Sequence, residues 1–313
     1  MDKLKTFEAL LRTGKMDRRS FMSGAMALGV SMPTAMSMMG TALAAPKRGG
    51  RLRMGLTGGS TNDSLDPAQI LDEFMQNVSF GQLRNCLTEV DVDGTIKGEL
   101  AESWEASPDA TVWTFKIRKG VEFHNGKTMD VNDVIESINH HRGEDTKSAA
   151  KGIIESIEDI KADGDNVVFT LSGGSADFPY LLSDYHLGVC PAKPGGGIDW
   201  ESGVGTGGYS LVELDPGVRC LVKRNPNYWK ADTCFFDEVE SIQIADVNAR
   251  TAALRTGSID LMSNLDYKTV ALMKRSPGMR VLETKGNEHI TLPMLTDTAP
   301  FDNNDLRLAL KYS

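Results

Sequence analysis

One stretch in the second half of the chain places a helix between two strands, and it most constrains the fold. Strand patterns cover Val239–Ala245 and Ile259–Met262. Between them, Asp246 is a typical N-cap, and Gly257 stands where a helix over Val247–Thr256 would end. Two strands joined by a helix in so short a segment predict a βαβ-type crossover. We therefore expect an α/β fold.

Other elements follow from residue periodicity, caps and turns. Apolar and polar residues alternate in several segments, which predicts strands at Arg51–Leu56, Trp113–Arg118, Ile157–Ala162, Val167–Leu171, Tyr209–Val212, Arg219–Arg224 and Met279–Thr284. Apolar residues at helical spacing predict helices at Asp72–Leu87, at Val131–Ile138 after the cap Asp130, at 266–273 after the cap Asp266, and at Leu306–Ser313.

Composition and charge exclude several classes of protein. The chain has 313 residues, of which 40% are hydrophobic and 25% charged, so it is neither disordered nor low in complexity. Its net charge of −9 argues against binding to nucleic acid.

The first 44 residues have the pattern of an export signal. A paired arginine stands in Asp17-Arg18-Arg19-Ser20-Phe21-Met22, and a weakly apolar stretch follows to Leu43. Ala42-Leu43-Ala44 fits a small-x-small cleavage site. These features predict a twin-arginine secretory signal over 1–44 and a periplasmic mature chain. A membrane anchor is the alternative, but an anchor needs about 20 strongly apolar residues.

Export would permit disulfides among the four cysteines. Cys220 and Cys234 flank a turn and are the most plausible pair, although spacing alone cannot prove it. No Cys/His cluster predicts zinc. The segment Asp91-Val92-Asp93-Gly94 resembles a calcium loop, but Leu100 stands where that loop requires a glutamate, so we predict a hairpin turn.

No catalytic or cofactor motif is evident. The chain has no GxSxG elbow, Walker loop or HExxH sequence. Gly203–Gly208 imitates a dinucleotide-binding loop, but Tyr209 begins a strand where that motif needs a helix. We therefore predict no enzyme activity, no cofactor and no metal.

Several motifs together resemble one family. The quoted segments are Leu65-Asp66-Pro67, Leu100–Glu105, Trp113–Gly126, Gly205-Thr206-Gly207-Gly208-Tyr209, Arg224-Asn225-Pro226-Asn227-Tyr228-Trp229, and Pro300-Phe301-Asp302 with Leu306–Leu310. Their order over Arg51–Ser313 resembles the extracytoplasmic solute-binding proteins of family 5, which serve ABC importers of peptides, nickel and related solutes. Gly208 departs from the family, which usually has proline there.

The resemblance implies a periplasmic-binding-protein-like fold with two lobes, a hinge and three domains. Domain I would comprise 45–88 and 205–284, with domain II, 89–204, inserted in it. Domain III would begin at 285 and be incomplete, because the sequence stops within an expected helix. We accordingly expect that this chain alone does not bind its ligand tightly.

The resemblance also implies a function. We expect a monomer that captures a small solute, a di- or oligopeptide, by hinge closure and delivers it to the membrane permease. Within the family, a nickel metallophore, an opine or a sugar remains an alternative. Outside it, the alternative is a periplasmic enzyme exported by the twin-arginine route.

Candidate ligand contacts lie in loops that such a fold points into its cleft. A carboxylate there could meet an ammonium group, and an aromatic ring could cover a side chain, although acids also suit an ordinary helix start. The expected contacts are Gly59, Ser60, Thr61, Asp72, Glu73, Phe74, Tyr185, His186, Gly207, Asn287 and His289.

Overall fold

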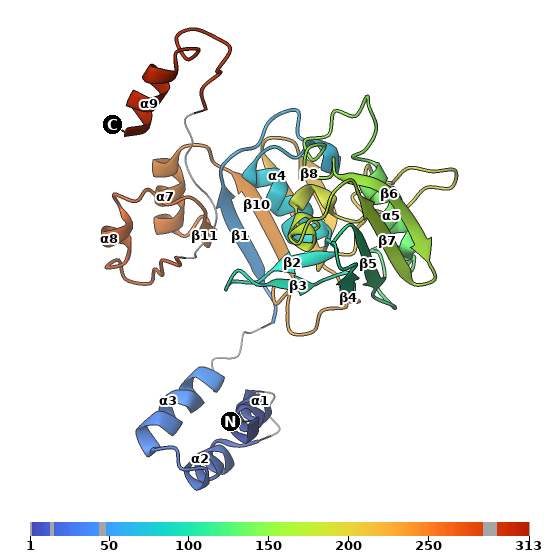
Figure 1. The fold of residues 1–313 in the computed structure, drawn as a ribbon. Coiled ribbons are helices and arrows are strands. Elements are labelled where there is room, and N and C mark those ends of the chain that lie inside the picture. Colours follow the sequence, from blue (N-terminus) through green and yellow to red (C-terminus); the bar gives the residue numbers. More distant parts are fainter. Residues whose placement is uncertain (1, 13–15, 44–47, 284–292, 313) are drawn as a thin grey trace.

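The computed structural model describes residues 2–12, 16–43, 48–283 and 293–312. Its strands form two main sheets and one small hairpin (Figure 1). The α-helices are α1 (Asp2–Arg12), α2 (Arg18–Ala27), α3 (Met32–Leu43), α4 (Glu73–Val78), α5 (Val131–Asn139), α6 (Phe178–Leu181), α7 (Val247–Thr256), α8 (Val270–Met273) and α9 (Asn304–Tyr312). Shorter turns of other helix types are η1 (Pro67–Gln69), η2 (Ser79–Leu83, a π-helix) and η3 (Tyr185–Leu187).

The first sheet has five strands in the order β11-β1-β10-β9-β8. They are β1 (Arg51–Leu56), β8 (Tyr209–Asp215), β9 (Arg219–Arg224), β10 (Glu238–Gln243) and β11 (Leu261–Met262). β1 is parallel to both β10 and β11, whereas β9 and β8 continue the sheet antiparallel. The predicted crossover is confirmed: α7 connects β10 to β11 in parallel, with β1 between them. The carboxylate of Asp246 caps α7, and Gly257 ends it at φ +75°.

The second sheet is antiparallel in the order β4-β5-β7-β6. Its strands are β4 (Ala101–Ala106), β5 (Val112–Ile117), β6 (Ile157–Asp163) and β7 (Asn166–Leu171). A separate hairpin joins β2 (Thr88–Val90) to β3 (Ile96–Gly98), which confirms the turn predicted in place of a calcium loop.

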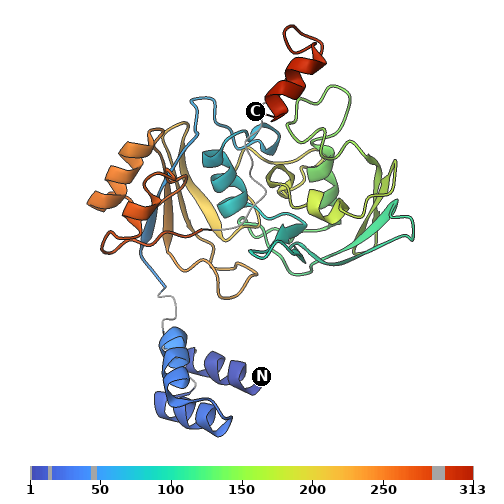
Figure 2. The same ribbon diagram turned by 60° about the vertical axis from the view of Figure 1, so that its left-hand side comes forward.

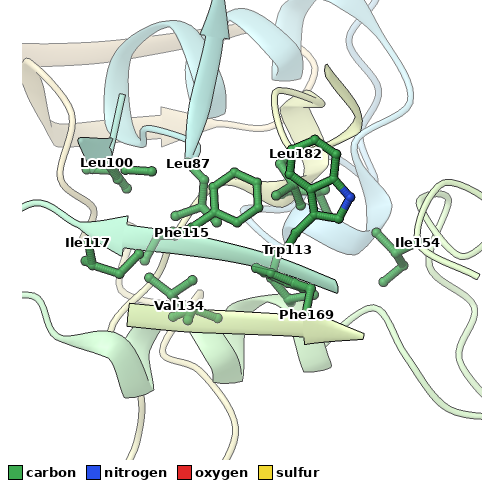
Figure 3. Packing of buried hydrophobic residues seen from close by; sticks show 14 of the residues in the cluster. Leu87, Leu100, Trp113, Phe115, Ile117, Val134, Ile154, Phe169 and Leu182 are labelled. Carbon is green, nitrogen blue, oxygen red and sulfur yellow. The ribbon is translucent and has the colours of Figure 1, made fainter. Parts of the chain in front are cut away.

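Each sheet has its own hydrophobic core. In the second, alternate residues of β5 and β7 point inward against α5 and the 178–189 segment (Figure 3). Phe115 is fully buried, and its ring centre lies 5.5 Å from that of Phe169 in an edge-on arrangement. Trp113 and Phe123 are buried too, while Trp104 is only partly buried.

A buried polar junction joins the two sheets. Asn85 donates to Glu99 Oε1 at 2.7 Å and accepts from the Thr206 hydroxyl at 3.1 Å. Lys230 lies 2.6 Å from both Glu99 Oε1 and Glu89 Oε2. Burial raises the pKa of Glu99, although Lys230 opposes that shift. The Arg224–Trp229 motif is thus followed directly by Lys230, whose contacts help to connect the two sheets.

The helices α1, α2 and α3 pack on one another around their own small core (Figures 1 and 2). Phe21, in the paired-arginine motif, is fully buried there. Asp17 caps α2, since its Oδ1 accepts a hydrogen bond from the Ser20 amide at 2.8 Å.

Three predicted elements differ from the structure, and one observed strand was not predicted. The helix expected over 266–273 is present only as α8, Val270–Met273. The helix expected over 72–87 divides into α4 and η2, and Arg84 after them is extended. The segment 279–283, expected as a strand, is irregular. β4 was not predicted, because a register shift between Ala101 and Ser103 interrupts its alternation.

The predicted Cys220–Cys234 disulfide is wrong for this structure, in which all four cysteines are free thiols. Cys220 is paired with Leu214 near one end of β9, whereas Cys234 packs against Gly208, beyond the strand's other end. Four strand residues, about 13 Å, separate these ends, and a disulfide needs Cα atoms within about 7 Å. Burial also raises the pKa of the Cys220 thiol to about 12.

Candidate functional site

The carboxyl ends of three parallel strands meet at one edge of the first sheet. Because β1, β10 and β11 run the same way, the chain leaves all of them at this edge, through segments 57–64, 244–246 and 263–266. In open α/β sheets ligands bind beyond such an edge. We call it the carboxyl edge.

The loop after β1 brings three predicted site residues to the carboxyl edge, Gly59, Ser60 and Thr61. Asp63 fixes its shape, since Oδ2 accepts hydrogen bonds from the amides of Ser60 at 3.0 Å and Gly217 at 3.2 Å. Ser60 and Thr61 themselves are exposed. The hydrogen bonds of Asp63 therefore fix the loop backbone, while the side chains of Ser60 and Thr61 stay exposed.

The start of α4 lies against this loop and carries the predicted Asp72 and Glu73. Gly58 has φ +87°, and a Cβ there would lie 2.7 Å from that of Asp72, so only glycine permits this approach. Asp72 caps the helix, accepting from the Met75 amide at 3.0 Å. Glu73 accepts a hydrogen bond from the Asn264 side chain, which follows β11.

Negative charge gathers at this point. Asp63, Asp72 and Glu73 lie on neighbouring segments, and burial together with the charge of Asp72 raises the pKa of Asp63. Such an arrangement favours a cationic group on a ligand, such as an ammonium.

A groove of about 470 Å³ opens farther along the same helix. The two views place α4 between the two sheets (Figures 1 and 2). The groove is lined by Gln76, Phe80, Ile153, Tyr180, Leu181, Ser183, Asp184 and Tyr185. Glu73, Gln76 and Phe80 follow one another at helical spacing, so one face of α4 and η2 leads from the carboxyl edge into the groove.

Tyr185 is the predicted residue that reaches this groove. Its ring centre lies 4.0 Å from that of His186. Burial, with the nearby Asp184 carboxylate, raises the pKa of Tyr185, so its hydroxyl stays protonated at neutral pH. Gln76 and Phe80, which also line the groove, were not predicted from the sequence.

Two predicted contacts lie inside the protein instead. Phe74 is fully buried in the first core. His186 is 3% exposed, with Nδ1 2.6 Å from Asp184 Oδ1 and Nε2 2.8 Å from the Ile70 carbonyl. These two side chains support the site rather than line it.

Gly207 belongs to the crossing between the sheets. Its carbonyl accepts from Asn225 Nδ2 at 3.1 Å and lies 3.0 Å from His124 Nε2. A Cβ on Gly207 would lie 2.2 Å from the Gln82 carbonyl oxygen, so the residue is enclosed by backbone. Gly207 was expected to contact the ligand, but in the structure it has a packing role.

The predicted Asn287 and His289 lie outside the described residues. Within the described ranges, no three His, Cys, Asp or Glu side chains lie close enough together to hold a metal ion. None of the helices in that part of the chain is long and apolar enough to cross a membrane.

The chain is similar in sequence to known binding proteins. The family model of "Bacterial extracellular solute-binding proteins, family 5 Middle" matches residues 95–313. Heme-binding protein A of Haemophilus influenzae is 32% identical over 276 residues, covering 79% of this chain and 50% of that protein. Glutathione-binding protein GsiB of Pectobacterium atrosepticum is 26% identical, covering 82% and 50% respectively.

Solved structures show the same likeness. PBP AgaA of A. tumefaciens R10, in complex with agropinic acid, superposes with a TM-score of 0.64 at 28% identity, covering 73% of this chain and 46% of that one. DppA of Helicobacter pylori, in complex with the peptide STSA, gives 0.62 at 26% identity, covering 74% and 50%.

The chain spans about half the length of the curated relatives that it matches. The matched description is of solute-binding proteins and not of enzymes. On the match over residues 95–313 and on the shared fold, the chain belongs to family 5 of the bacterial extracellular solute-binding proteins.

Proposed function

We propose that this chain is the solute-binding component of an ABC importer and that it captures a short peptide. The peptide would lie along α4, between the carboxyl edge and the groove. A membrane permease would receive it, and the chain would act as a monomer.

The order of groups along α4 is the observation that carries this proposal. Glu73 supplies a carboxylate at one end, Gln76 an amide in the middle, and Phe80 with Tyr185 an apolar wall at the other end. A short peptide presents the complementary order of ammonium, main-chain amides and an apolar side chain. The face from Glu73 to Phe80 is about 10 Å long, which equals about three extended residues.

Two relatives support this class of ligand. The matched GsiB is described as glutathione-binding, and the matched DppA structure contains a peptide. Heme-binding protein A and AgaA, with agropinic acid, point to other solutes. The binding test therefore has to include those ligands.

The domain assignment is part of the proposal. Domain I would contain the first sheet (45–88 and 205–284), and domain II the second (89–204). Segment 285–313 would begin domain III, and hinge closure of the lobes would bury the peptide. The separate cores of the two sheets and the buried Asn85–Glu99 contact between them support this division.

Ligand-observed NMR titration with Ala-Ala-Phe tests the peptide proposal. We expect Glu73→Gln and N-acetylation of the peptide each to weaken binding about tenfold or more, because each removes a charge-assisted contact. Glu105→Gln, on β4, is the matched control and should bind as the parent does. Equal binding of the acetylated peptide, or preference for heme, agropinic acid or a nickel–histidine complex, would overturn the proposal.

Export by the twin-arginine route is also part of the proposal. Conversion of Arg18-Arg19 to Lys-Lys should block release of the mature chain into the periplasm. Mass spectrometry of the parent protein from its natural host should give a mature chain that begins near Ala45. An unprocessed parent, or normal processing of the Lys-Lys variant, would contradict this route.

A further inference from the structure

Three histidines lie close enough to interact electrostatically, and one of them follows the groove-lining Tyr185. His140 and His141 follow α5, with ring centres 5.4 Å apart, and His186 lies on η3. The rings of His140 and His186 each meet a carboxylate. His140 Nε2 lies 2.7 Å from Asp66 Oδ1, and His186 Nδ1 lies 2.6 Å from Asp184 Oδ1.

The third ring, that of His141, has no carboxylate partner. It is 1% exposed, and its Nδ1 lies 2.7 Å from the Ser148 hydroxyl oxygen. In the described part of the chain, Nε2 has no hydrogen-bond partner. Burial, and then the charges of His140 and His186, lower the pKa of His141 to about 3, although Asp66 and Asp184 act in the opposite direction.

Ser148 belongs to the segment that forms one wall of the groove. Its hydroxyl oxygen accepts a hydrogen bond from the Ala150 amide at 3.1 Å. The Ala149 amide donates to the Ala68 carbonyl at 3.0 Å, which ties the segment to η1. Ile153, four residues after Ala149, lines the groove. The segment 143–153 is therefore docked beside the site by the contacts of residues 148 and 149, together with Ala150, which is fully buried in the second core.

This docking suits only a neutral His141 ring. The neutral ring satisfies Nδ1 with Ser148 and leaves one nitrogen unpaired. A protonated ring would carry a second donor at Nε2 without an acceptor, and a buried charge beside two other histidines. Water can solvate that charge only if the segment moves away.

We propose that the His141–Ser148 contact is an acid-sensitive latch, which opens the 143–153 segment as the pH falls and speeds release of the bound solute. The solute part of this inference rests on the proposed function. The opening of the segment does not.

The direction follows from proton linkage. A histidine titrates near 6.5 when solvated, and His141 near 3 when the latch is closed. The open form therefore binds more protons between these values, so the closed form is fully favoured above 6.5 and loses that advantage as the pH falls. The ratio of open to closed segment should rise about tenfold per pH unit below 6.5, or about 30-fold from pH 7.5 to 5.

Hydrogen exchange of the full chain, followed by mass spectrometry at pH 7.5 and 5.0, tests the latch. After correction for intrinsic rates, protection of the Ala149 and Ile153 amides should fall about 30-fold, while the β7 amides keep theirs. His141→Asn should abolish the pH effect, because asparagine can still meet Ser148 but cannot take up the proton. His124→Asn, at a half-buried histidine whose pKa burial also lowers, is the control and should retain it.

Several results would overturn the latch. They are an equal loss of protection in β7, no loss at Ala149 and Ile153, and persistence of the loss in His141→Asn. If that variant does not fold, Ser148→Ala replaces it. This variant should lower protection at both pH values and keep the pH dependence, because His141 still takes up its proton on opening.

Peptide release gives a separate measurement. Stopped-flow displacement of Ala-Ala-Phe should be about 30-fold faster at pH 5.0 than at 7.5 in the parent chain, and pH-independent in His141→Asn. If the peptide binds at neither pH while the exchange result holds, the proposed function fails and the latch stands. If the exchange result fails, the latch is wrong whatever the peptide does.

Discussion

The second sheet buries every other residue of its two central strands, whereas the first sheet ends three parallel strands at an edge of polar loops. On β5 and β7 the inward side chains of Phe115 and Phe169 are completely buried. At the carboxyl edge, Ser60 and Thr61 are exposed, and Glu73 is only partly buried. Under the proposed function, the second sheet contributes mainly stability, and the carboxyl edge of the first sheet provides the binding surface.

Phe115→Ala should have the largest effect on stability. The ring is fully buried among Trp104, Trp113, Phe169 and Phe178, so its loss leaves a large cavity. We expect a loss of about 3–5 kcal/mol in the free energy of unfolding, measured by urea titration. Tyr267→Ala, at a ring that is 92% exposed, is the control and should change stability by less than about 0.5 kcal/mol. Similar losses of unfolding free energy in both variants would contradict the conclusion that the core of the second sheet contributes most to stability.

Lys230→Met tests the junction between the two regions. It would leave the Glu99 carboxylate, 4% exposed, without its cation. Breaking a buried pair costs about 3–5 kcal/mol, and we expect about 2–3 because a fifth of Lys230 is exposed. Lys193→Met, which breaks the exposed pair with Glu201, should cost less than about 1 kcal/mol.

The pH dependence gives the Lys230→Met experiment a second check. Burial already raises the pKa of Glu99, and removing Lys230 should raise it further. A carboxyl group whose pKa is higher in the folded state binds more protons there, so the variant should regain stability as the pH falls through that pKa. A variant whose deficit stays constant with pH would contradict this account of the junction.

Gly208→Ala tests the position where the family usually has proline. A Cβ there would lie 2.0 Å from Cys234 Sγ and 3.1 Å from a Tyr228 ring carbon. Overpacking of this kind costs about 1–3 kcal/mol. Adding Cys234→Ala should restore most of the loss, and the double-mutant cycle by urea titration measures it. If the losses of the two single variants simply add in the double variant, the contact with Cys234 is not what disfavours a larger residue at position 208.

The sequence predicted elements whose patterns are local. Asp246 and Gly257 define both ends of α7, and inward residues such as Trp113 and Phe115 define β5. The family resemblance then predicted the overall fold into which these elements assemble. The order of strands around β1 depends on contacts far apart in the chain, which no local pattern contains.

The candidate site was harder to predict than the fold. Local sequence does not determine which face of α4 is covered, so Phe74 was expected at the ligand, although it lies in the core. Gln76 and Phe80, on the open face, were missed for the same reason. His186 was expected to contact the ligand together with Tyr185, on the family resemblance, but only Tyr185 lines the groove.

Glu73→Gln should have the smallest effect on stability and therefore tests the comparison most sharply. Glu73 is partly exposed, and its hydrogen bond with Asn264 can persist in the glutamine variant through its own carbonyl oxygen. We expect a change of less than about 0.5 kcal/mol in the free energy of unfolding. Because the same variant should bind Ala-Ala-Phe about tenfold more weakly, one substitution would separate binding from stability. A loss of stability comparable to that of Lys230→Met would instead make the carboxyl edge part of the scaffold, and the division between the two sheets would fail.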